Sequence, residues 1–585
     1  MEDPGRDPAG SEWLRVARLD ELTARGCMPV STAGHTIALF AHGDGVYAVD
    51  NRCPHMGFPL HRGTVRDGIL TCHWHHARFD LASGGTFDPF AGDVPTFPAE
   101  VRDGEVWVAV GAHADDAAYH ERRLATGLEL DIPLVMAKSI LSLARTVPGM
   151  QTAVGQGIAF ATRYRAAGWG QGATMLTCMA NLLSALAPAD RPRALYHGAA
   201  AVARDCAGEP ARFPLDPLPD GAAAPDLVKA WFRQFVEVRD AEGAERCLVT
   251  AVARGAAPET LADMLFAAAT DHRYLQIGHV LDFTNKALEA LDLTRWREAD
   301  VVLGSLARAY ARAGRMEESN SWRHPVDLVA ILEAAFDDLP RALAAGADRG
   351  PWDDEDRLVP VLLADDPAAI AGALLGALEA GATATQVAAA VAYAAALRIA
   401  RFHEQNEFAD WDTALHTFTF AHAVHAGLRR SPSAELLRGA FDAAMSVYLD
   451  RFLNIPAAKL PTPDGSRRDP QAILAGFPDL LDEQHAIGPA AQAVADYLAA
   501  GGEPDALLAR LGALLLREDR DFHTIQTVEA AVAEFRLRRG TPEGANILVA
   551  AARYLAAHAP TMRAQGQTFE IAQRFVRGEN LYEEA

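Results

Sequence analysis

The sequence predicts a multidomain protein in which a small all-β domain is followed by a large, weakly repetitive all-α domain. The β domain is predicted by short alternating apolar and polar runs between about positions 12 and 112, separated by turn residues. The α domain is predicted by Ala, Leu, Arg and Glu at helical spacing from about Pro133 onward. We therefore divide the chain into a flexible N-terminus (1–11), the β domain (12–112), a linker (113–132) and the all-α domain (133–585).

The strands of the β domain are expected to be short and antiparallel. The runs 36–40 and 46–49 flank the turn sequence His-Gly-Asp-Gly at 42–45, and the runs 97–101 and 106–110 flank Arg-Asp-Gly at 102–104. A further short run, 69–71, leads into a loop that contains a cysteine and several histidines. This pattern is typical of a compact antiparallel unit built from hairpins.

Two Cys-plus-His pairs lie in this β region. Cys53-Pro-His55 is followed, after sixteen intervening residues, by Cys72-His-Trp-His75. Such pairs can hold the two irons of a Rieske [2Fe-2S] cluster, because two thiolates neutralise one iron while two neutral imidazoles ligate the other. A structural zinc site is the alternative for this ligand set, but zinc fingers usually place both histidines after both cysteines.

With these motifs, residues 10 to 112 resemble a Rieske domain, and the resemblance implies that Cys53, His55, Cys72 and His75 are the cluster ligands. Respiratory-type Rieske proteins carry an additional cysteine in each ligand loop, where this chain has Phe58 and Trp74. The domain therefore looks more like the Rieske ferredoxins and Rieske oxygenases. The neighbouring His73 and His76 are expected to be surface or supporting groups rather than ligands.

The composition of the chain limits which partners and which cellular compartment we expect for the protein. The 585 residues carry a formal net charge of −23, which argues against nucleic acid or an anionic membrane as a partner. There is no basic segment followed by an apolar one at the N-terminus, and the longest apolar run, 387–397, is too short for a membrane span. The four other cysteines are scattered without a disulfide framework, so we expect a cytoplasmic protein.

The helical region contains a weak internal repeat. Each unit opens with a glycine, continues into an apolar helix and reaches a histidine 22 to 35 residues later. The opening glycines are Gly170, Gly255, Gly381 and Gly501, and the histidines are His197, His279, His416 and His523. Four imidazoles in register predict one metal centre, although imidazole suits iron, copper, nickel and zinc alike.

The competing interpretation is that each histidine is a core or capping residue, which is the more common role of a single histidine on a helix. His422 and His425 lie three residues apart and can share one helix face, either as ligands or as interior residues. Paired Glu-x-x-His motifs of a di-iron site are not found. The β-branched alternation expected for the catalytic sheet of the usual Rieske oxygenase is also missing.

The helical region resembles the questin-oxidase-like proteins through Tyr-His-Gly at 196–198, Gly-His-Val-Leu-Asp at 278–282 and Asp-Phe-His-Thr-Ile at 521–525. This resemblance implies a mononuclear non-haem iron held by His197, His279, His416 and His523, and oxidation or ring opening of an anthraquinone-like substrate in secondary metabolism. A carboxylated lysine is also implied, but Lys286 does not match cleanly and is better interpreted as a solvated or ion-paired lysine near Glu289.

The polar insertion at 403–412 supplies candidates for orienting a ligand histidine or relaying protons, namely Asp412, Glu407 and His403. The alternative is a capped loop in which Asp412 is the N-cap of the helix that carries His416.

The sequence thus predicts an O2-dependent oxygenase whose Rieske cluster passes electrons to a histidine-ligated iron that oxidises an apolar, aromatic substrate. An external NAD(P)H-dependent reductase or ferredoxin would supply the electrons. The second hypothesis is a Rieske electron-transfer protein whose helical domain is a docking or regulatory scaffold for a separate enzyme.

Overall fold

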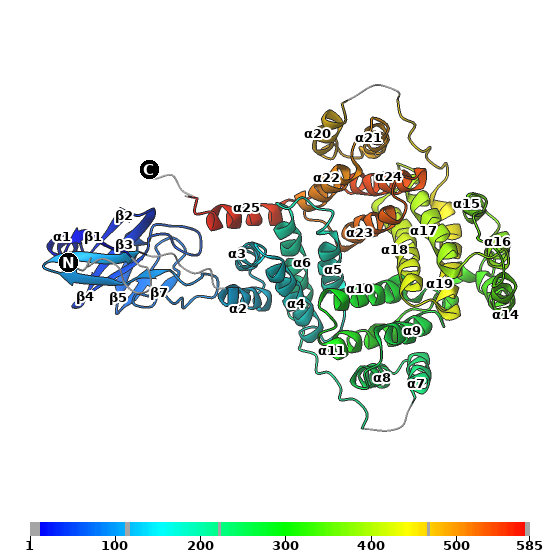
Figure 1. Ribbon diagram of the computed structural model, residues 1–585, viewed down its shortest axis with the longest axis horizontal. Coiled ribbons are helices and arrows are strands. Elements are labelled where there is room, and N and C mark those ends of the chain that lie inside the picture. The colour runs from blue at the N-terminus through cyan, green and yellow to red at the C-terminus, as the bar shows by residue number, and fades with distance from the viewer. Residues whose placement is uncertain (1–11, 111–116, 220–223, 465–468, 580–585) are drawn as a thin grey trace. The chain divides into compact units, whose positions relative to one another are not determined.

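Figure 1 shows the computed structural model, which describes residues 12–110, 117–219, 224–464 and 469–579. The expected flexible N-terminus, 1–11, lies outside the described residues. The chain forms two compact units, one of Met1–Ala153 with Gln567–Ala585 and the other of Val154–Gly566. A small β domain followed by a large helical region, as the sequence predicts, is the architecture found.

The first unit contains three small antiparallel sheets. Their strand orders are β1-β10-β9, β2-β3-β4-β8 and β5-β6-β7. The strands are β1 (Glu12–Arg18), β2 (Cys27–Thr32), β3 (His35–His42), β4 (Gly45–Asp50), β5 (Thr64–Arg66), β6 (Ile69–Thr71), β7 (Arg78–Asp80), β8 (Thr96–Phe97), β9 (Ala99–Arg102) and β10 (Glu105–Val110). Both predicted hairpins are present, as β3–β4 and β9–β10. The helix α1 (Leu19–Arg25) is an element that the strand pattern did not predict.

Strand β3 separates two small cores. Ile37 and Leu39 belong to the core that includes Val106 of β10, whereas Ala38 and Phe40 belong to the core that surrounds the cysteine loops. Successive side chains of a strand point to opposite faces, so one strand serves both cores. The cysteines are therefore enclosed by apolar packing that the alternating sequence pattern specifies.

The first unit also contains two helices that follow the sheets. They are α2 (Ala117–Glu129) and α3 (Pro133–Leu143), and Pro133 stands at the start of α3, where its missing N–H costs nothing. The predicted linker, 113–132, is therefore helical over most of its described part. A Cβ atom at Gly127 of α2 would lie 2.7 Å from the Met136 side chain, so glycine permits the close approach of α2 to α3.

The second unit is helical throughout its described residues. Its long helices are α5 (Gln171–Leu182), α6 (Arg191–Cys206), α7 (Pro225–Glu237), α8 (Ala241–Ala253), α9 (Pro258–Ala269), α10 (His279–Leu293), α14 (Leu328–Gly346), α16 (Pro367–Glu379), α17 (Ala384–Ala400), α18 (Phe408–Arg430), α19 (Ala434–Asp450), α20 (Pro470–Leu480), α21 (Ile487–Ala499), α22 (Pro504–Arg517), α23 (Phe522–Leu537) and α24 (Pro542–Ala557). Shorter helices are α11 (Ala299–Gly304), α12 (Ala307–Arg312), α13 (Asn320–Arg323) and α15 (Glu355–Leu362). Two helices, α4 (Val147–Arg163) and α25 (Ala564–Val576), contribute residues to both units.

The predicted repeat corresponds to four pairs of consecutive helices. Each opening glycine precedes the first helix of a pair, and each histidine lies on the second, in α5–α6, α9–α10, α17–α18 and α22–α23. Gly255, Gly381 and Gly501 have φ values of 72°, 105° and 78°, in the left-handed region that glycine adopts after a helix. Helix α18 packs against both α10 and α23 in this unit (Figure 1). Among the described residues, no helix has the length and apolar character needed to span a bilayer.

Candidate metal centres

Two loops of matching backbone geometry carry the four predicted cluster ligands. In the first loop the N–H of Cys53 donates to the carbonyl of Phe58 at 2.9 Å, and the N–H of Gly57 donates to the carbonyl of Cys53 at 2.7 Å. The second loop repeats both bonds, from Cys72 to Ala77 at 2.9 Å and from His76 to Cys72 at 3.1 Å.

The residue four places after each cysteine closes the turn. Gly57 and His76 both have left-handed backbones, with φ values of 83° and 61°. Left-handed geometry is easy for glycine and less common for histidine. His76 therefore closes the turn of the second loop, as Gly57 closes that of the first.

The side chains of the two loops converge. Cys53 and Cys72 are free thiols and only 1% exposed. A hydrogen bond from Cys53 lowers the pKa of Cys72 to about 6, which favours the thiolate that a metal needs. The imidazole rings of His55 and His75 lie 4.7 Å apart between centroids, and the His75 side chain is exposed.

The chemistry of this donor set fits a [2Fe-2S] group. Burial lowers the pKa of His55 to about 4, so its ring is neutral at pH 7 and retains a lone pair. Its Nδ1 atom is buried and has no hydrogen-bond partner among the described residues. A buried nitrogen without a partner is costly unless something else binds it. An iron–sulfur cluster held by the two thiols and two imidazoles would supply that binding partner.

A second group of side chains lies in the helical unit. His279, His416 and His523 each offer a ring nitrogen, and these three atoms lie within 4.8 Å of one another. The Nε2 atoms of His416 and His523 are 3.1 Å apart. Because metal–imidazole bonds are about 2.0–2.1 Å long, two ligands on opposite sides of one ion are about 4.2 Å apart. Small side-chain rotations would therefore allow all three rings to bind a single metal ion.

The three rings come from helices that are distant in sequence. His279 is the first residue of α10, His523 is the second residue of α23, and His416 lies within α18. Burial lowers the pKa of His279 to about 3 and that of His416 to about 4, with the neighbouring imidazoles acting in the same direction. Both rings are consequently neutral ligands at pH 7.

An unusual backbone segment positions His279. Gln276, Ile277 and Gly278 have φ values of 50°, 49° and 94° immediately before α10. Left-handed geometry is unfavourable for a β-branched residue such as Ile277, and such strain is concentrated at functional sites. A Cβ at position 278 would lie 2.9 Å from the Phe420 Cβ atom, so glycine is needed where α10 starts against α18.

Asp412 supports this histidine group. Its Oδ2 atom lies 3.7 Å from Nδ1 of His523, and its Oδ1 atom accepts a hydrogen bond from the Tyr554 hydroxyl at 2.7 Å. Burial acts to raise the pKa of Asp412, but the neighbouring His558 and the Tyr554 hydroxyl lower it below its ordinary value. Asp412 lies inside α18, which begins at Phe408, so the alternative that it is the N-cap is wrong.

The other two residues proposed from the polar insertion have structural contacts. Glu407 is the N-cap of α18 and forms a reciprocal capping box with Asp410. Nδ1 of His403 accepts a hydrogen bond from the backbone N–H of Gln405 at 3.3 Å. Among the described residues, Asp412 is therefore the one of the three candidates that contacts the histidine group.

His197 does not join the group, which corrects the prediction of four converging histidines. It lies on α6, is 3% exposed, and its Nε2 atom has no hydrogen-bond partner among the described residues. Burial lowers its pKa to about 3, as expected for a neutral interior imidazole. The repeat places a histidine on each second helix, but only three of the four helices direct it to one point.

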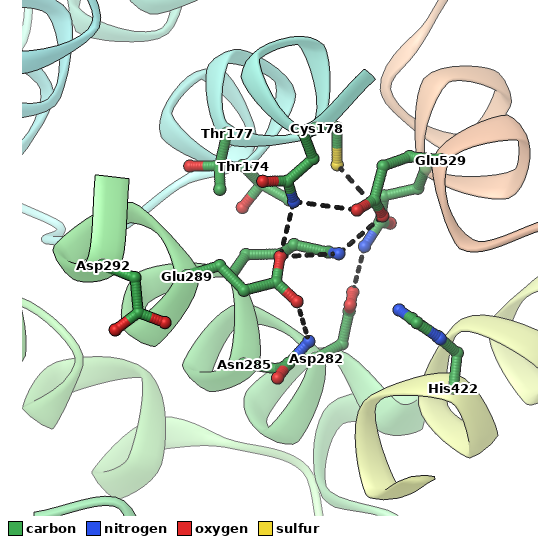
Figure 2. Close-up of polar contacts among 12 residues, drawn as sticks. Thr174, Thr177, Cys178, Asp282, Asn285, Glu289, Asp292, His422 and Glu529 are labelled. Carbon is green, nitrogen blue, oxygen red and sulfur yellow. Dashed lines mark hydrogen bonds and ion pairs between the residues drawn. The ribbon is translucent and has the colours of Figure 1, made fainter. Parts of the chain in front are cut away.

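Lys286 is an ion-paired lysine, as the sequence interpretation favoured, but it is buried rather than solvated. Its Nζ atom donates to Glu529 at 2.5 Å and to Glu289 at 3.0 Å. Figure 2 shows these two carboxylates in the polar cluster. The side chain is 1% exposed. Asn181 donates to the same two carboxylates, at 2.8 and 2.7 Å.

This polar cluster was not predicted from the sequence. Its carboxylate and imidazole atoms are close enough to share a metal ion, within 4.8 Å of one another in Glu289, His422 and Glu529. The same three residues line a cavity of about 280 Å³. The Lys286 ammonium already pairs with both carboxylates, so an internal cation compensates one of their two negative charges. The histidine group is consequently the stronger candidate for a metal centre.

His422 and His425 share one helix face, as their spacing predicted, and both are interior residues. Their Nδ1 atoms lie 2.8 and 3.0 Å from Oε1 of Glu534 on α23. Burial opposes protonation of His422, but Glu534 raises the pKa of this histidine above its ordinary value. No sequence pattern linked Glu534 to these histidines, because the contact joins helices more than one hundred residues apart.

Comparison with known proteins identifies a Rieske domain in the first unit. A model of the Rieske [2Fe-2S] domain matches residues 12–98. The ferredoxin subunit of anthranilate 1,2-dioxygenase from Burkholderia cepacia is 30% identical over 102 residues, which are 17% of this chain and 94% of that protein. Oxidoreductase NdmD from Pseudomonas putida is 30% identical over 111 residues, but the match covers only 19% of its length.

A further relative, 4beta-methylsterol monooxygenase from Methylococcus capsulatus, is 32% identical over 115 residues, covering 18% of this chain and 31% of that protein. Among solved structures, a chain of the complex of reduced oxygenase and oxidized ferredoxin in carbazole 1,9a-dioxygenase is 28% identical, with 17% of this chain and 92% of that chain covered and a TM-score of 0.16.

The fold and the paired Cys/His loops define an iron–sulfur, electron-transferring protein. Through residues 12–98 the chain belongs to the Rieske [2Fe-2S] domain family. This match favours the cluster over the zinc alternative for the N-terminal ligand set.

Proposed function

We propose that the chain is an O2-dependent oxidoreductase in which a Rieske cluster passes electrons to a mononuclear non-haem iron. The proposed cluster ligands are Cys53, His55, Cys72 and His75, and the proposed iron ligands are His279, His416 and His523. The observation that carries the proposal is the convergence of three imidazoles from three helices, two of them with a lowered pKa. When bound, the cluster supplies one-electron transfer and the iron supplies O2 activation.

The surrounding residues support this assignment. Asp412 is placed to orient the His523 ring through Nδ1, which would leave Nε2 directed toward His416. Oxygen reduction also consumes protons, and Asp282 lies one helical turn after His279. Burial raises the pKa of Asp282 to about 7, so its carboxyl can hold a proton near neutral pH.

Asp282 also connects the two polar regions of this unit. It accepts a hydrogen bond from Gln526, which lies one turn after His523, and its Oδ1 atom is buried without a partner among the described residues. The charged cluster of Lys286, Glu289 and Glu529 follows on the same faces of α10 and α23 (Figure 2). We assign Asp282 the role of holding a proton between that cluster and the histidine group.

The proposed substrate and the proposed electron donor rest on the sequence motifs and on the relatives of the Rieske domain. An apolar, aromatic substrate rests on the short motifs that resemble the questin-oxidase-like proteins. An external NAD(P)H-dependent reductase or ferredoxin is proposed because the relatives of residues 12–98 include ferredoxin components of dioxygenase systems. Those same relatives favour the second candidate function, in which the Rieske domain serves a separate enzyme and the helical unit is a docking scaffold.

Metal and sulfide analysis of anaerobically purified protein distinguishes the two functions. A Rieske cluster alone contributes two irons and two sulfides per chain. We expect a third iron, its loss in His279→Ala with the visible spectrum of the cluster unchanged, and its retention in the control His403→Ala. Two irons in all three proteins, also after anaerobic reconstitution with ferrous iron, would refute the oxygenase and leave the electron carrier.

A further inference from the structure

A lysine outside the β sheets contacts the first cluster loop. Lys138 lies in the middle of α3, and its Nζ atom donates to the carbonyl oxygens of Pro54 and His55, at 2.7 and 2.6 Å. Those two carbonyls belong to residues that directly follow Cys53. The side chain thus contacts the backbone of the proposed ligand His55, which lies 83 residues earlier in the sequence.

The surroundings of Lys138 keep this amine close to the loop. The Phe575 ring lies on another side of Nζ, which is 3.8 Å from the ring centroid. Lys138, Phe575 and Phe90 also line a cavity of about 300 Å³ next to the loop. A lysine ammonium has three donors and no acceptor, which suits two carbonyls and the face of an aromatic ring.

A second cation of the same helical pair holds the neighbouring segment. Arg123 of α2 donates to the carbonyls of Pro89 and Ala91, both at 2.7 Å. Phe90, between those residues, packs its ring 5.0 Å from that of His55. Helices α2 and α3 therefore fasten two segments of the cluster domain, but only Lys138 places its charge directly on the ligand loop.

We propose that Lys138 is a redox-tuning residue whose ammonium raises the reduction potential of the cluster. Reduction adds one electron to the cluster and no atom to Lys138, so the fixed positive charge favours the more negative, reduced state. Hydrogen bonds, net charge and solvent exposure are the features by which a protein adjusts an iron–sulfur potential. Phe575 strengthens the effect because it keeps water from one side of the charge.

The test is a spectroelectrochemical titration of the full-length protein and its variants. The measurement is made at pH 6, well below the ordinary pKa of a lysine. In Lys138→Met we expect the equilibrium constant for one-electron reduction to fall about tenfold, which corresponds to about 59 mV. Lys138→Arg should stay near the wild-type potential because it keeps the charge.

The matched control is Lys459→Met, which removes the same charge from an exposed lysine in the other unit. A Lys138→Met potential equal to that of wild type and of this control would overturn the proposal. If Lys138→Met fails to assemble its cluster, Phe575→Ala replaces it as the test. That variant keeps the ammonium but admits water, so a smaller fall is expected and an unchanged potential overturns the proposal.

This inference rests on the proposed cluster ligands, and the experiment separates the two ideas. The visible and electron paramagnetic resonance spectra of each variant report whether a Rieske cluster is present and whether its ligands are unchanged. Wild-type protein without a Rieske spectrum would refute the cluster itself. An unaltered spectrum with an unaltered potential would refute only the role of Lys138.

Discussion

Lys286 allows a sharp test of how the helical unit tolerates buried charge. Its ammonium lies 2.5 Å from Glu529 and 3.0 Å from Glu289, and the side chains of Lys286 and Glu529 are 1% and 4% exposed. Burial acts to lower the pKa of Lys286, but the two carboxylates raise it well above its ordinary value. The substitution Lys286→Met keeps the aliphatic length and removes the charge.

The expected cost follows from the charges that are left behind. Removing one partner of a buried ion pair costs about 3–5 kcal/mol, because the remaining charge is neither solvated nor compensated. Glu529 would be in that position, since its hydrogen bonds from Asn181 and Cys178 carry no positive charge. We therefore expect Lys286→Met to lower the free energy of unfolding of the helical unit by about 3–5 kcal/mol. The double variant Lys286→Met, Glu529→Gln should recover part of that loss.

Denaturant unfolding followed by far-UV circular dichroism measures the effect. The control is Lys229→Met, because Lys229 makes a 2.7 Å ion pair with Asp263 in which the side chains are 21% and 27% exposed. A partly exposed pair is expected to contribute only about 0–1 kcal/mol. The reasoning would be refuted if the two lysine variants lost equal stability, or if the double variant were as unstable as the sum of its single changes.

Three further predictions concern other parts of the helical unit. Asp412→Asn should weaken iron binding at the proposed second centre about 10- to 100-fold, measured by competition with a chelator, while the cluster is retained. Glu534 has a lowered pKa and contributes stability that is lost as pH falls below about 4.5, whereas the raised pKa of His422 contributes stability that is lost above about 6.5. The stability difference between wild type and Glu534→Gln should therefore be largest between those pH values, and a pH-independent difference would contradict this. Ile277→Gly should stabilise the unit by about 1 kcal/mol in denaturant unfolding, because glycine adopts φ of 49° without strain; a loss of stability would show that the Ile277 side chain matters more.

The features predicted well from the sequence depend on local patterns. The alternation of β3 and the Arg-Asp-Gly turn before β10 specify strands through residues that are neighbours in the chain. The Cys/His pairs are equally local, since each pair lies in one loop of a few residues. Glycine spacing predicted the four helix pairs for a similar reason, because in three of them a left-handed glycine ends one helix before the next begins.

The features that were missed depend on contacts between distant helices. Lys138 gives no signal in the sequence, because an apolar helix with one lysine normally exposes it to solvent. Its carbonyl partners become visible only when α3 is placed beside the first cluster loop. For His197 the prediction of its position in the repeat is correct, but the prediction that it joins the other three histidines is wrong. The direction of its side chain is set by the packing of α6.

The polar face of α10 depends both on a local sequence pattern and on contacts with a helix that is distant in the sequence. His279, Asp282, Lys286 and Glu289 recur at intervals of three, four and three residues, which places them on one side of the helix. Such a stripe usually faces solvent, but Asp282 and Lys286 are buried, and His279 and Glu289 are half-buried. Burying a charged stripe is costly unless partners satisfy it, and α23 supplies them in the same order with His523, Gln526 and Glu529. The two helices thus pair imidazole with imidazole, carboxyl with amide and ammonium with carboxylate. These pairs are more polar than packing alone requires, which supports a chemical role for the unit.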